Sequence, residues 1–398
     1  MTRANNRPVI ENAAKTTPMP AGIHYLYHDL PRWVCSLKKL TGATRLYYLA
    51  WLFSVRRRLE RATGEYAADV YHHLTFAVDW VPSFLPHHLS CATVRGPLGG
   101  YDTSPEIRGF VPRKYVILDA VKKGIRKLGL RWIGKELAAF DLVLSNNEWF
   151  RQEYLAVAPD ARVKCISTQT ADTARASAPT TPFVSADRRG LRIVLGGRML
   201  YWKGHDAALE CLAELTHQGE TFEAVIIGNG TRSYKKHLER RRNQLGLSDS
   251  VSFVQEMPQR AFLECIRTAD VFLYPAFYGS ADSVMIEVIE LGTPLVCFPS
   301  GGAKELLGEE YPYMTASFAI DTLSQMILTA DRKDPAFVRA RETILAKHSR
   351  TSKIAQLVNA YDELLNHSAL TQDSSNGAGE QGDPSGGDDE LPHKTRRR

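Results

Sequence analysis

The sequence contains no apolar run long enough to cross a bilayer and no C-x-x-C pair. Its longest aromatic and apolar stretch, 46–55, is about half the length of a membrane span. The polar start, 1–15, has no signal-peptide core. The six cysteines lie singly in apolar segments, which is typical of reduced, buried thiols rather than disulfides or zinc ligands. These absences predict a cytoplasmic protein without a metal site.

Length and composition favour a globular protein of two domains. A chain of 398 residues can bury two cores, and 44% hydrophobic with 24% charged residues is ordinary for such proteins. The net charge of +6 suits nucleotide sugars, lipid headgroups or nucleic acid, and selects none of them. Segment 367–398 is polar and low in large apolar side chains, which predicts a disordered tail. The Ala, Thr, Ser and Pro of 173–190 indicate a linker.

The second half, 191–345, alternates apolar strands with helices. The predicted strands are 191–195, 222–227, 251–254, 271–274 and 294–298, and the predicted helices are 205–216, 234–245, 258–268 and 283–291. Strands joined by single helices form a parallel sheet, so we expect a Rossmann-like domain. Ligands bind such sheets outside the carboxyl ends of the strands.

The first half, 1–172, also has an α/β pattern. Its predicted strands are 70–73, 91–94 and 142–145, and its predicted long helices are 46–62 and 116–139. The polar start leaves open whether this domain has its opening strand. A last helix, 346–366, is predicted to cross back and brace the first domain. Both halves together predict an α/β fold of two Rossmann-like domains.

The loop after the first strand of the second half reads GGRMLYWKG and carries two cations. Gly197, Arg198 and Lys203 stand where a strand leads into a helix, and charge-assisted bonds and the helix N-terminus suit a diphosphate there. The alternative is that both cations are solvated surface charges.

Other candidates follow the later strands. Gly228 and Gly230 form a GNG turn, for which a tight turn alone is a sufficient role. Glu287 lies in a predicted helix and could hold ribose hydroxyls, or it is an exposed helix glutamate. The Gly301 and Gly302 pair would let a ligand approach the backbone.

In order, the segments GGRMLYWKG, IIGNG, VSFVQEMP, ADVFLYPAF and IEVIELGTPLVCFPSGGAKEL resemble one family. They are similar to the family 4 (group 1) retaining glycosyltransferases of GT-B fold. The resemblance implies two Rossmann-like domains facing across a cleft, a nucleoside diphosphate sugar as donor, and no cofactor. It implies retaining transfer to a glycan or lipid-linked acceptor, and no nucleic acid as partner.

The resemblance also implies roles for individual residues. The donor-binding set comprises Arg198 and Lys203 at the diphosphate, Glu287 at the ribose, backbone around Glu256 at the base, and the N–H groups of Ser283 and Val284 at the phosphates, together with Gly197, Gly228 and Gly230.

One position departs from the family pattern. The family carries two glutamates separated by seven residues, and Gly279 stands in place of the first, which contacts the transferred sugar. Either Asp282 takes over as a catalytic group, or the protein is a non-catalytic nucleotide-sugar-binding or assembly protein of the same fold.

In the first half, His72 and His73 end a predicted strand where the family often has a cleft-facing histidine, so both are catalytic candidates. The alternative is that each is packed or solvated. Gly99 and Gly100 resemble a Gly-Pro-x-Gly-Gly cleft loop of some members. Segment 113–136 is basic and apolar, which suits either peripheral contact with anionic lipid at the inner face of the membrane or an ordinary outer helix.

Overall fold

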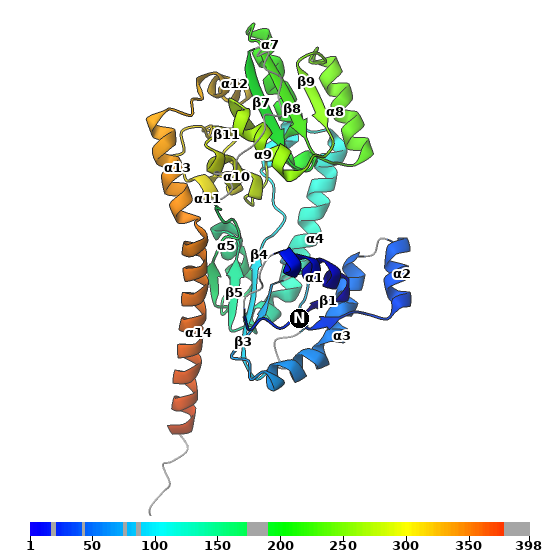
Figure 1. Cartoon of the computed structure of the whole chain (residues 1–398), viewed down its shortest axis with the longest axis vertical. Coiled ribbons are helices and arrows are strands. Elements are labelled where there is room, and N and C mark those ends of the chain that lie inside the picture. The colour runs from blue at the N-terminus through cyan, green and yellow to red at the C-terminus, as the bar shows by residue number, and fades with distance from the viewer. Residues whose placement is uncertain (17–20, 42–43, 75–77, 85–88, 173–189, 378–398) are drawn as a thin grey trace, which may run out of the picture.

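The computed structural model describes residues 1–16, 21–41, 44–74, 78–84, 89–172 and 190–377. Two parallel sheets form the centres of two α/β domains, one above the other in Figure 1. The predicted linker falls almost wholly on 173–189, outside the described residues, as does 378–398 of the predicted tail. Of the helices in the described part, none combines the length and apolar character that crossing a bilayer requires.

The carboxyl-terminal domain has a five-stranded sheet in the order β11-β10-β7-β8-β9, with all neighbours parallel. All five predicted strands are confirmed: β7 (Leu191–Gly196), β8 (Phe222–Ile227), β9 (Val251–Val254), β10 (Val271–Tyr274) and β11 (Leu295–Cys297). Their side chains are mostly buried because helices cover both faces. The strand order reverses at β7, so the crevice between the carboxyl ends of β7 and β10 is the expected ligand position.

Helices alternate with these strands, and the four predicted ones are confirmed. The helices of this domain are α7 (His205–His217), α8 (Arg232–Gln244), α9 (Gln259–Thr268), α10 (Ser283–Leu291), α11 (Gly301–Leu307), α12 (Ile320–Thr329) and α13 (Pro335–Lys347). Side chains of Thr231, Ser300 and Asp334 accept hydrogen bonds from first-turn N–H groups of α8, α11 and α13. Such caps fix where a helix begins.

The amino-terminal domain has a four-stranded parallel sheet in the order β3-β4-β5-β6. Its strands are β3 (Val70–His73), β4 (Ala92–Leu98), β5 (Leu142–Ser145) and β6 (Val163–Cys165). The earlier strands β1 (Thr2–Arg3) and β2 (Tyr27–His28) pair with each other in a separate sheet. The helices are α1 (Arg7–Thr16), α2 (Arg32–Thr41), α3 (Thr44–Glu65) and α5 (Glu148–Val157), of which only α3 was predicted.

Two long helices link the two domains (Figure 1). In α4 (Arg113–Ala138), Tyr115 and Val116 pack on the carboxyl-terminal core, whereas Leu130 and Ile133 belong to the amino-terminal core.

The other is α14 (Arg350–Gly377), which leaves the carboxyl-terminal domain and buries Ala360 and Leu364 against β4 and β5. Its end at Gly377 lies beyond the predicted 366, so the helix takes up the start of the predicted disordered tail.

Candidate functional site

The loops after β7 and β10 meet at the point where the strand order reverses. Gly204, between the short 3-10 turn Tyr201–Lys203 and α7, has φ +74°, and a Cβ there would lie 1.7 Å from the carbonyl oxygen of Pro275. Only glycine allows both the positive φ and this approach. The sequence Lys-Gly therefore holds Lys203 directly beside the loop that follows β10.

Lys203 is the central side chain of this site. Only 13% of this side chain is exposed, and its Nζ forms an ion pair with the carboxylate of Asp282. The same carboxylate accepts a hydrogen bond from the hydroxyl of Tyr274. The rings of Tyr274 and Tyr278 lie 6.0 and 5.5 Å from the ammonium. Burial, and then neighbouring Arg198, lower the pKa of Lys203 to about 7, whereas contact with Asp282 favours its charged form.

The start of α10 lies against the same group. Asp282 is the N-cap residue, but its carboxylate does not cap the helix because it is turned to Lys203. Ser283 and Val284 form the first turn, whose N–H groups carry the positive end of the helix dipole. The exposed Arg198, Lys203 and this helix N-terminus thus lie together, with the carboxylate of Asp282 among them, and the first three are groups that can bind a diphosphate.

The predicted glycines in the neighbouring loops permit close backbone packing. A Cβ at Gly228 would lie 1.8 Å from the carbonyl oxygen of Gly197, and one at Gly230 would lie 2.6 Å from that of Met199. The GNG turn therefore packs on the loop that carries Arg198. This is a structural need for glycine, and donor contact by these residues stays a prediction.

Two acidic candidates lie on either side of these loops. Glu256, after β9, accepts a 2.7 Å hydrogen bond from Asn229, so the loops after β8 and β9 are tied together. Glu287 is half-buried in α10, one turn after Ser283. Their predicted contacts with base and ribose are compatible with these places and stay predictions.

The glycine loop of the amino-terminal domain reaches the second domain. The hydroxyl of Tyr278 donates to the carbonyl of Gly100 at 3.1 Å, and the N–H of Gly279 donates to the carbonyl of Asp102 at 3.0 Å. A Cβ at Gly100 would lie 2.4 Å from Arg126 Nη2, so any side chain here would have to displace the buried ion pair of Arg126 and Asp79. Gly99 has more room, because the nearest atoms to its added Cβ are 3.8 Å away.

The departure from the family pattern, Gly279, lies between the two domains. A Cβ there would lie 3.5 Å from the Cβ of Asp102, which is an ordinary contact. The carboxylate of Asp102 pairs with Lys123 at 3.5 Å. Sequence reasoning missed Asp102 and Lys123, and the only signal for Asp102 was its place two residues after Gly100. A carboxylate from the other domain therefore lies beside the position of the absent glutamate.

A second group across the domains was also missed from the sequence. The Tyr101 hydroxyl lies 2.6 Å from that of Tyr201 and donates to Asp119 at 2.7 Å. The ammonium of Lys122 lies 4.3 Å from the ring of Trp202 and 4.9 Å from that of Tyr201. These hydrogen bonds and cation–π contacts hold the two domains together beside Lys203.

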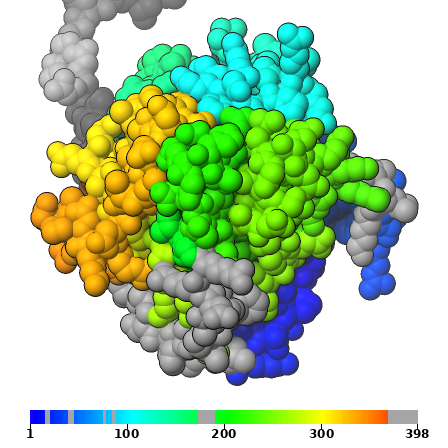
Figure 2. All heavy atoms as spheres, turned by 90° about the horizontal axis from the view of Figure 1, so that it is seen from above, coloured from blue at the N-terminus to red at the C-terminus, as the bar shows by residue number. Residues whose placement is uncertain are grey.

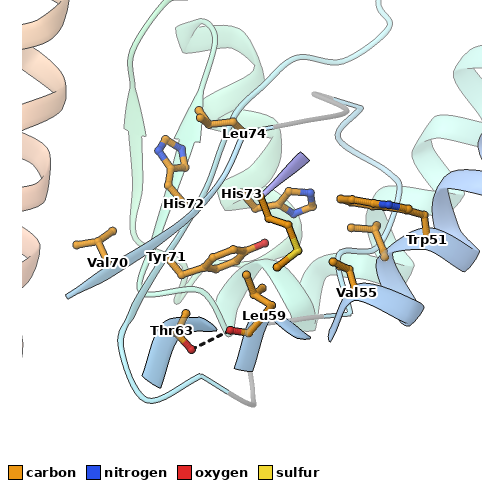
Figure 3. Close-up of a pocket in the computed structure, with 11 residues that line it drawn as sticks. Trp51, Val55, Leu59, Thr63, Val70, Tyr71, His72, His73 and Leu74 are labelled. Carbon is orange, nitrogen blue, oxygen red and sulfur yellow. Dashed lines mark hydrogen bonds between the residues drawn. The ribbon is translucent and has the colours of Figure 1, made fainter. Parts of the chain in front are cut away.

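His72 and His73 project from opposite sides of β3, as Figure 3 shows. His72 contacts the hydroxyl of Tyr361 in α14 at 2.5 Å and the carbonyl of Gly96 at 2.8 Å. His73 is buried between the hydroxyls of Tyr48 and Ser83, each 2.8 Å away, and burial lowers its pKa to about 3.

The side of β3 that faces α3 borders a cavity of about 320 Å³, and Trp51 and Leu59 are among the residues that line it (Figure 3). Both histidine rings are thus engaged by partners within the first domain and α14. Their catalytic role stays a prediction, and the geometry favours the alternative that they are packed.

Comparison with known proteins finds similarity to glycosyl transferases. Residues 185–331 match the family model described as glycosyl transferases group 1. The chain is 27% identical over 146 residues to 2-deoxystreptamine glucosyltransferase of Streptomyces kanamyceticus, covering 36% of this chain and only 37% of that relative. It is 22% identical to α-D-kanosaminyltransferase of the same organism, over 82% of this chain and 84% of that one.

Solved structures share the architecture. The UDP-forming α,α-trehalose-phosphate synthase from Burkholderia xenovorans superposes with a TM-score of 0.57 at 14% identity, over 80% of this chain and 78% of that one. The matched segment contains the β7 and β10 loops, and the structural likeness covers both domains. Residues 185–331 are therefore similar to the group 1 glycosyl transferases, and the chain is built on a GT-B fold.

Proposed function

We propose that the protein transfers a sugar from a nucleoside diphosphate sugar to a hydroxyl of a glycan or a lipid-linked acceptor, with retention at the anomeric carbon. The observation that carries this proposal is Lys203, largely enclosed where the strand order reverses and next to the first turn of α10. The related trehalose-phosphate synthase is described as UDP-forming, which is the donor chemistry proposed here. A cytoplasmic location at the inner face of the membrane belongs to the same proposal.

In the proposed reaction, the bond from the anomeric carbon to the terminal diphosphate oxygen breaks, and its electron pair leaves with the nucleoside diphosphate. The acceptor oxygen forms the new bond on the same face of the sugar, and its proton passes to the departing phosphate oxygen or to water. Lys203, Arg198 and the N–H groups of α10 would stabilise the negative charge that develops on the leaving group. This chemistry needs no protein nucleophile.

A second candidate function is nucleotide-sugar binding without transfer. Two observations favour it: Gly279 replaces the glutamate that contacts the sugar in the family, and Lys203 is already paired with Asp282. Under this alternative the crevice would still bind a nucleoside diphosphate, and only turnover would be absent.

The deciding experiment uses the purified full chain with a panel of nucleotide sugars, each with and without candidate acceptors. Release of nucleoside diphosphate and formation of glycoside are followed, and NMR of the product gives its anomeric configuration. Transfer that falls with Lys203→Ala but not with the exposed-site control Lys236→Ala supports the proposal. Tight nucleotide binding without transfer to any acceptor would favour the second candidate, and an inverted product would exclude retention.

A further inference from the structure

The exposed face of α4 carries a continuous apolar stripe. Ile117, Val121, Ile125, Leu128 and Trp132 recur every three or four positions, which places them on one side of the helix. They are 50 to 73% exposed, with Trp132 the most exposed. A stripe this exposed contributes little to the packing of the protein itself.

The opposite side of α4 already provides the packing that holds the helix. Leu130, Ile133 and Leu137 are buried in the amino-terminal core, and Tyr115 packs on the carboxyl-terminal core. The apolar stripe is therefore additional to what the fold needs. Figure 2 shows the cyan surface to which α4 belongs at one margin of the molecule, beside the carboxyl-terminal domain.

The charges on α4 are sorted by face. Arg113, Lys127, Arg131 and Lys135 are exposed and by their spacing run along one edge of the stripe, whereas the exposed Lys114 stands at the start of the stripe itself. The two acidic residues of the helix are turned inward, as the next contacts show. The exposed residues of α4 are thus apolar, small or basic.

Asp119 is buried and accepts hydrogen bonds from Tyr101 and Thr103, each at 2.7 Å. Glu136 accepts a 3.0 Å charge-assisted bond from Arg95. Neither carboxylate is left to offset the positive edge. A protein partner would need an apolar groove with an acidic rim, whereas an anionic bilayer offers both features over any length of helix.

We infer that the exposed face of α4 docks the protein on the surface of an anionic bilayer. The helix lies in the plane of the membrane, its apolar stripe enters the headgroup region, and the basic edge contacts lipid phosphates. Trp132, the most exposed residue of the stripe, would enter the headgroup region, where indole rings are favoured. This inference does not depend on whether the protein transfers sugar.

The basic edge of α4 also leads toward the candidate site. Lys127 and Arg131 line a cavity of about 380 Å³ whose other wall includes Tyr101 and Asp102, in the loop that reaches Gly279. If the proposed function holds, docking through α4 would bring lipid headgroups to the side of the crevice that the amino-terminal domain forms, and a lipid-linked acceptor is the class that fits this arrangement.

Vesicle flotation of the full chain, without nucleotide, tests the docking. We expect binding to vesicles of phosphatidylcholine mixed with phosphatidylglycerol, and little to phosphatidylcholine alone. Leu128→Asp, or the pair Lys127→Glu and Arg131→Glu, should weaken binding by at least about tenfold. The matched control reverses two exposed charges of α8, Lys236→Glu and Arg240→Glu, and should retain binding. Equal loss in the control, or no loss in the α4 variants, would overturn the inference.

A second measurement locates the helix relative to the lipid. Brominated phosphatidylcholine, added to the anionic vesicles, should quench tryptophan emission in the wild type and in Trp149→Phe, but much less in Trp132→Phe. Trp149 is the matched control because it is 57% exposed on α5. Light scattering without vesicles tests the alternative that the stripe binds a second copy of this chain. A dimer that Leu128→Asp dissociates would show that it does, and would overturn the inference.

Discussion

Lys203 and Asp282 form an ion pair between the loop after β7 and the N-cap residue of α10. The cation best placed for a diphosphate is therefore already neutralised by a carboxylate of the same chain. Since the Tyr274 hydroxyl donates to the same carboxylate oxygen, Asp282 is held in this place. A bound diphosphate and Asp282 would compete for one ammonium group.

This competition predicts that Asp282→Asn binds nucleoside diphosphates more tightly. Removing the competing charge should raise affinity by on the order of tenfold, because a bond to a charged group contributes about 1.5 to 3 kcal/mol. Asparagine keeps the size of the side chain and an oxygen for Tyr274. Calorimetric titration with UDP, ADP and GDP measures the effect.

Turnover of the same variant separates two roles of Asp282. If Asp282 also acts on the transferred sugar, kcat should fall by about 10²-fold while affinity rises, as for loss of a group that acts in the transition state. Unchanged or weaker nucleotide binding by Asp282→Asn would exclude the competition.

Lys203→Ala and Arg198→Ala should each weaken diphosphate binding by about 1.5 to 3 kcal/mol, the contribution of a charge-assisted bond. Calorimetry with the same nucleotides measures this loss, and circular dichroism checks the fold. Lys236→Ala, which removes an exposed cation of α8, is the matched control. Normal affinity in both variants would return Arg198 and Lys203 to the role of surface charges.

Gly279→Glu should fold, because an added Cβ at this position meets Asp102 at ordinary contact distance. The new carboxylate would lie near that of Asp102, so we expect it to be less stable than the uncharged Gly279→Gln. Urea unfolding gives both free energies. In an Asp102→Asn background the difference between the two variants should disappear, and a difference that persists would show that Asp102 is not its cause.

Stability should decline in mild acid because three buried histidines are neutral in the folded state. Burial lowers the pKa of His205 and His348 to about 4 and that of His73 to about 3. Unfolded histidines titrate near about 6.5, so between about pH 6.5 and pH 4 the unfolded chain binds more protons. The free energy of unfolding therefore falls as pH is lowered through this window, by up to about 1.4 kcal/mol per pH unit for each histidine.

Urea unfolding across this pH range measures the slope. His205→Gln should reduce the slope of the free energy of unfolding against pH by the contribution of about one bound proton. His217→Gln, at an exposed site, is the control and should leave it unchanged. A free energy of unfolding that does not change below about pH 6.5 would contradict this account.

Sequence reasoning located the carboxyl-terminal sheet well because its signals are local. Buried parallel strands are short apolar runs, and the helices after β7, β8 and β11 begin at a glycine or a side-chain cap, as at Gly204. The predicted loop residues Lys203 and Asp282 do meet in the structure. Their ion pair was not predicted, since it depends on the distance between two loops.

The amino-terminal domain was less predictable for physical reasons. Its strand β6 has three residues of which only Val163 is buried, and the strands β1 and β2 that adjoin α1 and α2 have two residues each, too few for an apolar run. Asp102 was missed because its relation to Gly279 arises only when the two domains meet. The role expected of His72 and His73 depended on which side of β3 faces the second domain, and Tyr361 of α14 occupies one of those sides.

The two helices that join the domains limit how the molecule can move. Because α4 and α14 lie on opposite sides in Figure 1 and each is packed on both domains or leads from one to the other, wide opening would strip buried side chains from one of them. We expect the least loss of buried contact when the domains rotate about a line that passes through both helices. Substrate exchange should therefore proceed by a small rotation of one domain against the other. A bilayer bound along α4 would slow this rotation.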